Sequence, residues 1–297
     1  MKIYIHYPIQ QKAWGGGNQF LKNLFNEFAS RQIICTDPRF ADIILFNSHH
    51  SINTCWALKK KFPKKKFIHR VDGPMRLYNR MDDNRDFHVY RANELIADGT
   101  VFQSHFSLEK NKEMGMKTDK PFQVIGNAID SSIFYKPTER NKNKKIQIIS
   151  NSFSPNIKKG FNVYKFLDEK LNFNFFNYIF AGQSPVKFKN IKNVGVKSSN
   201  QIAELLRSSH IYITASQNDP CSNSLIEAIA CGACCYALNS GGHSEIITNN
   251  DFLFNDCASA LSLFRNIEKN GLPSYNIKTF SLKEIANQYV NFFSDVR

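Results

Sequence analysis

Short apolar segments that suit strands alternate with amphipathic segments that suit helices along the whole chain, and the alternation runs twice. In the first half, strands are expected at residues 2–7, 43–46, 67–71, 99–102 and 122–125. After a polar stretch, the alternation restarts with strands expected at residues 146–150, 178–181, 190–194, 211–214, 234–238 and 252–254. Strands that alternate with helices predict a parallel sheet covered on both faces. The expected fold class is therefore α/β, with two parallel sheets.

The polar stretch at residues 136–145 divides the two halves. We expect an N-terminal domain at residues 1–138, a second domain at residues 139–280 and a final helix at residues 281–297. That helix opens with a capping box, Ser281-Leu282-Lys283-Glu284. Its apolar residues fall along one face: Leu282, Ile285, Tyr289 and Phe292 or Phe293.

Several features bear on where such a chain resides. The 297 residues contain no apolar run near the roughly 18–20 residues that span a bilayer, and the first residues lack a secretory pattern. The seven cysteines lack disulfide-framework spacing, and packing explains the Cys231-x2-Cys234 pair better than half a zinc site does. We expect a cytoplasmic protein, at most peripheral on the cytoplasmic membrane face.

The charge is unusual, because 39 Lys and Arg oppose 25 Asp and Glu, a formal net charge of +14. Much of it lies in two runs, residues 59–66 and 140–145. A positive field attracts phosphate groups on nucleotides, nucleic acids or anionic membranes. The alternative is that both runs are solvated loops.

Ligands of open parallel sheets bind beyond the carboxyl ends of the strands, so the loops after the strands are the candidate sites. A glycine-rich turn at residues 15–17, with Gly16 and Gly17, would let a helix N-terminus approach an anion, or is a plain turn. Lys158 and Lys159 offer ammonium groups to a diphosphate, or are a solvated pair.

The loop after the strand at 211–214 carries two acids, Asp219 and Glu227, around the start of a helix. The backbone amides of three residues there could hold an anion while the acids bind a polyol: Asn223, Ser224 and Leu225. Glu227 could instead complement its own helix dipole.

His69 and Asp72 close a strand of the first half and could hydrogen-bond a substrate hydroxyl. A histidine at a strand end is also often simply structural.

In this order, the segments resemble the retaining glycosyltransferases of family 4. Residues 124–134 are similar to the family's vIpNGiDtexF stretch, and Asp219-x7-Glu227 looks like its E-x7-E motif. Residues 227–232 look like EAmAcG, residues 241–247 look like GGxpEii, and Gly15–Gly17 matches the glycine-rich loop before the first helix.

The resemblance implies the GT-B fold: two Rossmann-like domains whose parallel sheets face each other across a cleft, with the last helix crossing back to the N-terminal domain. It implies that Glu227 binds the donor ribose, and that the amides of residues 223–225 bind its phosphate. Lys159, with Lys158 as a possible substitute partner, would bind the diphosphate, and the loop with Gly16 and Gly17 would close over it. The residues expected at the reacting sugar or acceptor are His69, Asp72 and Asp219.

The reaction implied is transfer of a sugar from a UDP- or GDP-linked donor, with retention of configuration and without a metal or other cofactor. The acceptor class is a glycan, a polysaccharide or a lipid-linked sugar, an anionic membrane surface is a further expected partner, and nucleic acid is not.

The chain departs from the family pattern at several positions. Asp219 replaces the first Glu, Ser154 stands where an Arg is usual, and Gly126 and Ala128 replace Pro and Gly. The departures at Asp219 and Ser154 keep open the alternative of a transferase that binds donor without turnover. Two further alternatives are a basic nucleic-acid-binding protein and another two-domain enzyme, such as a nucleotide-sugar epimerase or a phosphorylase-like protein.

Overall fold

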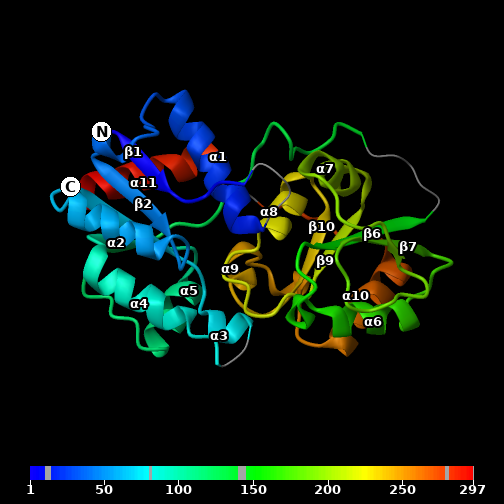
Figure 1. Cartoon of the computed structure of the whole chain (residues 1–297). Helices are drawn as coiled ribbons and strands as arrows, with labels where there is room; N and C mark the ends of the chain where they lie inside the picture. The colour runs from blue at the N-terminus through cyan, green and yellow to red at the C-terminus, as the bar shows by residue number, and fades with distance from the viewer. Residues whose placement is uncertain (11–14, 80–81, 140–144, 278–280, 297) are drawn as a thin grey trace. The chain divides into compact units, whose positions relative to one another are not determined.

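The computed structural model describes residues 1–10, 15–79, 82–139, 145–277 and 281–296 (Figure 1). The chain forms two compact units. Unit 1 consists of Met1–Gln11, Gly17–Ala128 and Phe280–Arg297, and unit 2 of Lys12–Gly16 and Ile129–Thr279. Residues 140–144, within the polar stretch that divides the two halves, lie outside the described residues.

Unit 1 contains a parallel sheet of five strands in the order β1-β2-β3-β4-β5. The strands are β1 (Ile3–His6), β2 (Ile43–Asn47), β3 (Lys66–Val71), β4 (Gly99–Phe102) and β5 (Phe122–Val124). The helices are α1 (Gly16–Ser30), η1 (Pro38–Phe40), α2 (Ile52–Lys61), α3 (Met75–Tyr78), α4 (Arg85–Ile96), α5 (His105–Glu113) and α11 (Leu282–Val296). Every strand expected in this half is present.

Buried apolar residues on both faces explain why the central strands form. All five residues of β2 are buried, as are five of the six in β3, which is typical of a parallel sheet with helices on both faces. The amphipathic face of α1 contributes Phe20, Leu21, Leu24 and Phe28 to the same core as β1.

The last helix, α11, packs into the core of unit 1. Its capping box forms, with the Ser281 amide 2.7 Å from the Glu284 carboxylate and the Glu284 amide 3.1 Å from the Ser281 hydroxyl. Tyr289 and Phe293 are fully buried against the aromatic residues of α1. The prediction that the last helix returns to the first sheet is therefore confirmed.

Unit 2 contains a parallel sheet of six strands in the order β11-β10-β9-β6-β7-β8. The strands are β6 (Ile146–Ser152), β7 (Phe176–Gly182), β8 (Lys192–Asn193), β9 (Ile211–Thr214), β10 (Cys234–Leu238) and β11 (Leu253–Phe254). The helices are η2 (Ile157–Lys159), α6 (Phe161–Lys170), α7 (Ser199–Ser208), α8 (Asn223–Ala230), α9 (His243–Ile246), η3 (Asn250–Phe252) and α10 (Cys257–Asn270).

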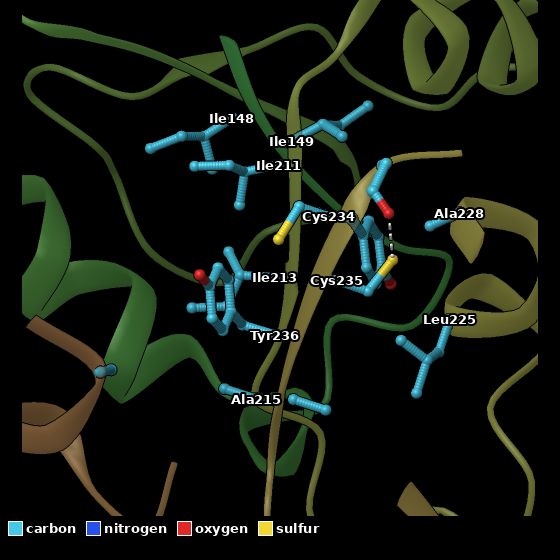
Figure 2. Packing of buried hydrophobic residues seen from close by; sticks show 14 of the residues in the cluster. Ile148, Ile149, Ile211, Ile213, Ala215, Leu225, Ala228, Cys234, Cys235 and Tyr236 are labelled. Atoms are coloured by element: carbon cyan, nitrogen blue, oxygen red, sulfur yellow. Dashed lines mark hydrogen bonds between the residues drawn. The ribbon is translucent and has the colours of Figure 1, made fainter. Parts of the chain in front are cut away.

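The core of unit 2 lies around β6, β9 and β10 (Figure 2). Cys234 and Cys235 point into it among isoleucine and tyrosine side chains, and Cys231 is equally buried. All seven cysteines are free thiols. The Cys231-x2-Cys234 pair therefore packs the core, as the packing interpretation predicts.

The two edge strands of unit 2 are shorter than predicted. The strand expected at 190–194 is only Lys192–Asn193, and the one expected at 252–254 is Leu253–Phe254. Both pair on one side alone, and β8 carries exposed polar residues. Because each of these strands has one neighbouring strand and buries little apolar surface, only two of its residues adopt strand geometry. No helix in the described residues is long and apolar enough to cross a membrane.

Candidate functional site

Three neighbouring strands of unit 2 bring the candidate residues of that unit to one edge of the sheet. The strands β10, β9 and β6 are adjacent and parallel, so their carboxyl ends meet at the same edge. Lys159 follows β6, Asp219 follows β9, and the turn at Gly241 and Gly242 follows β10.

Lys159 and Asp219 form an ion pair at this edge. The Lys159 Nζ lies 3.1 Å from the Asp219 Oδ2, and the two side chains are 18% and 15% exposed. The Ser216 hydroxyl also donates to this oxygen, at 3.4 Å. Burial by itself raises the pKa of Asp219, but Lys159 and then His243 outweigh it and hold the pKa below its ordinary value. Asp219 is therefore ionised at neutral pH.

Two glycines allow the neighbouring loops to pack closely against the loop that carries Asp219. Gly241 has φ +68°, and a Cβ there would lie 2.3 Å from the Asp219 carbonyl oxygen. The next amide, of Gly242, donates to that oxygen at 2.8 Å. Gly160 has φ +92°, and its Cβ would lie 2.3 Å from the Ala215 Cβ. The position of the ion pair therefore depends on both glycines.

The helix α8 begins directly after this loop with its N-terminal amides uncapped by the preceding side chain. Ser222 is the N-cap residue, yet in the described structure its side chain makes no capping hydrogen bond. Its hydroxyl instead lies 3.2 Å from the Ser224 hydroxyl. Amides of a first helical turn carry the positive end of the helix dipole, so those of residues 223–225 suit an anion.

Glu227 lies in α8, partly exposed but closely surrounded by protein. Among the described residues, its carboxyl group makes no hydrogen bond and no ion pair. Burial raises its pKa to about 8. A carboxyl group without partners can accept from or donate to hydroxyl groups, and a polyol would satisfy it.

His243 is a residue to which sequence reasoning gave no role. It is fully buried, and its Nδ1 lies 2.8 Å from the Leu238 carbonyl oxygen. Its Nε2 is buried and has no hydrogen-bond partner within the described chain. Burial lowers its pKa, while the nearby charge of Asp219 opposes the shift. A histidine directly after a Gly-Gly turn at a strand end is the signal that could have found it.

In unit 1, Asp72 follows β3 and belongs to a buried polar network. Its Oδ1 accepts from Arg70 Nη1 at 3.1 Å and from the Gln103 side-chain amide. The fully buried Arg70 also donates to Asn47 at 2.6 Å and to Asn127 at 2.7 Å. The Asp72 side chain is 20% exposed, so a ligand at this edge of the sheet could reach it.

His69 occupies a different environment from Asp72, although the two are close in sequence. It has no exposed surface, and its ring stacks on Phe46 with centroids 4.1 Å apart. Its Nε2 lies 3.0 Å from the Ser48 carbonyl oxygen and its Nδ1 lies 3.3 Å from the Asn93 amide. Burial lowers its pKa to about 4. As placed here, His69 has no face open to a substrate.

Two histidines that sequence reasoning missed lie after β2 at the same edge as Asp72. The rings of His49 and His50 are 4.2 Å apart, and Tyr7 meets His50 edge-on at 5.0 Å. The Nδ1 atoms of both histidines are buried without hydrogen-bond partners in the described structure. Burial lowers both pKa values, that of His49 to about 4. The sequence signal is the Ser-His-His-Ser run after a strand.

The remaining predicted site residues lie at the beginnings of helices. Gly16 and Gly17 are the first two residues of α1. Lys158 lies in η2, where its amide donates to the Asn156 Oδ1 at 3.0 Å and its carbonyl oxygen accepts from the Gln217 amide at 2.7 Å. Within the described ranges, no group of three or more His, Cys, Asp or Glu side chains is arranged to hold a metal ion.

Comparison with known proteins finds one family model that matches part of the chain. Residues 134–270 match the family model described as glycosyl transferases group 1. This segment contains the candidate residues that follow β6, β9 and β10. No curated protein matches the chain.

Solved structures resemble the whole chain at low sequence identity. Sucrose-phosphate synthase (tll1590) from Thermosynechococcus elongatus is 13% identical with a TM-score of 0.73, over 99% of this chain and 94% of that one. Anabaena Alr3699/HepE in complex with UDP-glucose is 11% identical with a TM-score of 0.68, over 100% and 98%. The pneumococcal O-GlcNAc transferase GtfA, in complex with UDP and GlcNAc, is 13% identical with a TM-score of 0.61, over 86% and 56%. The predicted GT-B fold class is therefore confirmed.

Proposed function

We propose that this protein is a glycosyltransferase that takes a sugar from a nucleoside-diphosphate sugar. The observation that carries the proposal is the carboxyl edge of unit 2. There, Lys159, Asp219 and the start of α8 with Glu227 lie in the segment that matches the glycosyl transferases group 1 model.

Each of these groups has a role in binding the donor. The unpartnered carboxyl group of Glu227 would bind the ribose hydroxyls, and the amides of residues 223–225 would bind phosphate oxygens. Lys159 would turn from Asp219 toward the diphosphate and stabilise the charge that develops there as the sugar leaves. Once Lys159 has turned away, Asp219 can accept hydrogen bonds from sugar hydroxyls.

The lysine and the helix N-terminus together supply the positive charge that a diphosphate leaving group needs. We therefore propose transfer without a bound metal and, as in retaining family 4, with retention of configuration. UDP is the first nucleotide to test, because the Anabaena and pneumococcal structures contain UDP or UDP-glucose.

The acceptor side of the proposal rests on Asp72, His49, His50 and Tyr7 in unit 1. The lowered pKa values keep both imidazoles neutral at pH 7, and Arg70 already pairs with Asp72. Neutral imidazoles and a phenol suit hydroxyl groups rather than a phosphate. This favours the sugar of a glycan, polysaccharide or lipid-linked acceptor.

The experiment is a thermal-shift screen with UDP, GDP, ADP and CMP and their common sugar conjugates. A ligand that binds only the folded state raises the melting temperature. We expect one nucleoside diphosphate to raise it in wild type and in the control Glu204→Ala, an exposed site on α7, but not in Glu227→Ala. No shift with any nucleotide would contradict the proposal.

A donor-binding protein without turnover is the second candidate, because Asp219 is one methylene shorter than the family's Glu. Product analysis of the matching nucleotide sugar distinguishes the two candidates. Nucleotide release by wild type supports the transferase, whereas release by Asp219→Glu alone supports the degenerate protein.

A further inference from the structure

The lysine run at residues 59–66 lies at the amino edge of the unit 1 sheet. It ends α2 and begins β3, and Lys66 pairs in register with Ile43, the first residue of β2. The short helix η1 ends just before β2, at Phe40. We propose that this edge is a docking surface for an anionic lipid bilayer, and we call it the basic patch: Phe40, Lys60, Lys61, Phe62 and Lys64.

Five of the six lysines of the run divide into two groups, and Lys66 is the first residue of β3. Lys59 pairs with Asp98 at 3.0 Å, and Lys65 donates to the Arg39 carbonyl oxygen at 2.9 Å and to the Ala41 carbonyl oxygen. Lys60, Lys61 and Lys64 are exposed and make no salt bridge within the described chain. Two lysines therefore anchor the local structure, and three present their charge to solvent.

An open groove of about 550 Å³ lies among these lysines. It is lined by Ala41, Asp42 and residues 61–66. Phe62 forms part of its wall, with the ammonium groups of Lys61 and Lys65 5.5 and 5.3 Å from its ring centre. These lysines lie over an apolar surface, as lysines do where a protein meets a membrane interface.

Phe40 is an exposed apolar group beside these charges. The residue is 70% exposed, yet hydrogen bonds hold the backbone on both sides of it. Asp37 caps η1 by accepting from the Arg39 amide at 2.8 Å, and Lys65 binds the carbonyl oxygens on both sides of Phe40. A fixed aromatic ring among ammonium groups can insert at the lipid headgroup boundary.

The chemistry favours lipid over nucleic acid. Each lysine near an anionic leaflet contributes to attraction, and a phenyl ring without a polar atom gains by leaving water. A single strand of nucleic acid would need open aromatic faces for its bases. Cationic groups already lie over both rings of the patch: Lys61 and Lys65 over Phe62, and the Arg39 guanidinium 5.8 Å from the centre of Phe40. An anionic bilayer therefore fits this surface best, because it can bind the ammonium groups and also take up the Phe40 ring.

Docking at this edge would set the distance between membrane and acceptor. Asp72 and His49 lie at the opposite, carboxyl edge of the same sheet. At ~3.3 Å per residue, β2 and β3 separate the edges by roughly 15–20 Å. The acceptor hydroxyl would therefore stand at least that far from the bilayer surface.

The test is co-sedimentation with phosphatidylcholine vesicles that contain or lack phosphatidylserine. We expect wild type to bind only the phosphatidylserine vesicles, and raised salt to weaken the binding. The triple variant Lys60→Glu/Lys61→Glu/Lys64→Glu should lose binding at least tenfold, and Phe40→Ala about tenfold. Binding that does not depend on phosphatidylserine, or an unchanged Phe40→Ala variant, would overturn the proposal.

A matched control separates the basic patch from net charge. Lys187→Glu/Lys189→Glu/Lys192→Glu makes the same charge change at exposed positions in unit 2 and should bind vesicles as wild type does. Equal loss in both triple variants would overturn the proposal, as would tighter binding to a DNA duplex than to vesicles at the same salt. An unchanged melting temperature of each variant shows that its fold is intact.

Discussion

At the scale of single residues, the carboxyl group of Glu227 destabilises the folded protein when it is ionised. Its carboxyl group is enclosed without a partner in the described chain, and its pKa is raised from 4.5 to about 8. The pKa of Glu227 is higher in the folded state than in the unfolded state. Its contribution to the free energy of unfolding is therefore fully present below about pH 4.5 and is lost as the pH rises through 8.

Glu227→Gln should remove this pH dependence. We expect the variant to gain stability over wild type as the pH rises from 5 to 9, by at least ~1.4 kcal/mol, the free energy of one pKa unit. Urea unfolding at several pH values measures the difference. Parallel curves for the two proteins would contradict the assignment.

A second prediction for single residues follows from the ion pair between Lys159 and Asp219. Neutralising the acid leaves the Lys159 ammonium available to a diphosphate, so Asp219→Asn should bind UDP several-fold more tightly. The same variant should release less nucleotide from the sugar donor, because a sugar contact is weakened. Weaker UDP binding by Asp219→Asn than by wild type would show that the carboxylate itself holds the nucleotide.

Histidines show the limit of sequence reasoning about single residues. His69 and His49 both lie at strand ends, and a sequence cannot tell which ring turns into the core. The structure buries His69 completely against Phe46, whereas His49 and His50 keep partial exposure after β2. The positions of Lys159, Asp219 and Gly241 after strands could be predicted, because the direction of each strand follows from the parallel alternation.

At the scale of elements, the loop after β10 depends on Gly241. Gly241→Ala would place a Cβ 2.3 Å from the Asp219 carbonyl oxygen with φ +68°. We expect it to lower stability by ~2–4 kcal/mol and to weaken nucleotide binding. Gly195→Ala is the control: its φ is +71° but nothing lies within 4 Å, so only ~1 kcal/mol should be lost. Equal melting temperatures for the two variants would refute the close approach.

The last helix, α11, supplies part of the core of unit 1. Phe293→Ala removes a fully buried ring that packs near Phe28 and should cost ~3–5 kcal/mol of unfolding free energy. Asn291→Ala, on the exposed face of the same helix, should change it by less than ~0.5 kcal/mol. Similar values for both would mean that α11 does not stabilise the unit.

The bounds of a strand could be predicted where both faces of that strand are buried. The strands at 99–102, 211–214 and 234–238 match their expected bounds, because apolar residues fill both faces. The edge strands β8 and β11 shrink to two residues each, since the apolar pattern cannot show how many sheet neighbours a strand has.

At the scale of the whole molecule, the candidate residues of both sheets share one position. In both units, the groups that we propose to bind substrate follow the carboxyl ends of strands, whereas the basic patch of unit 1 lies at the amino edge. The net charge of +14 predicts attraction to phosphate groups. It could not predict which lysines pair with acids and which face solvent.

The most direct test of the central claim is a calorimetric titration of UDP into wild type, Glu227→Ala and Glu204→Ala. The account predicts one site per chain, affinity reduced at least tenfold in Glu227→Ala, and wild-type affinity in Glu204→Ala. Equal affinity for all three proteins would contradict the placement of the nucleotide at the start of α8.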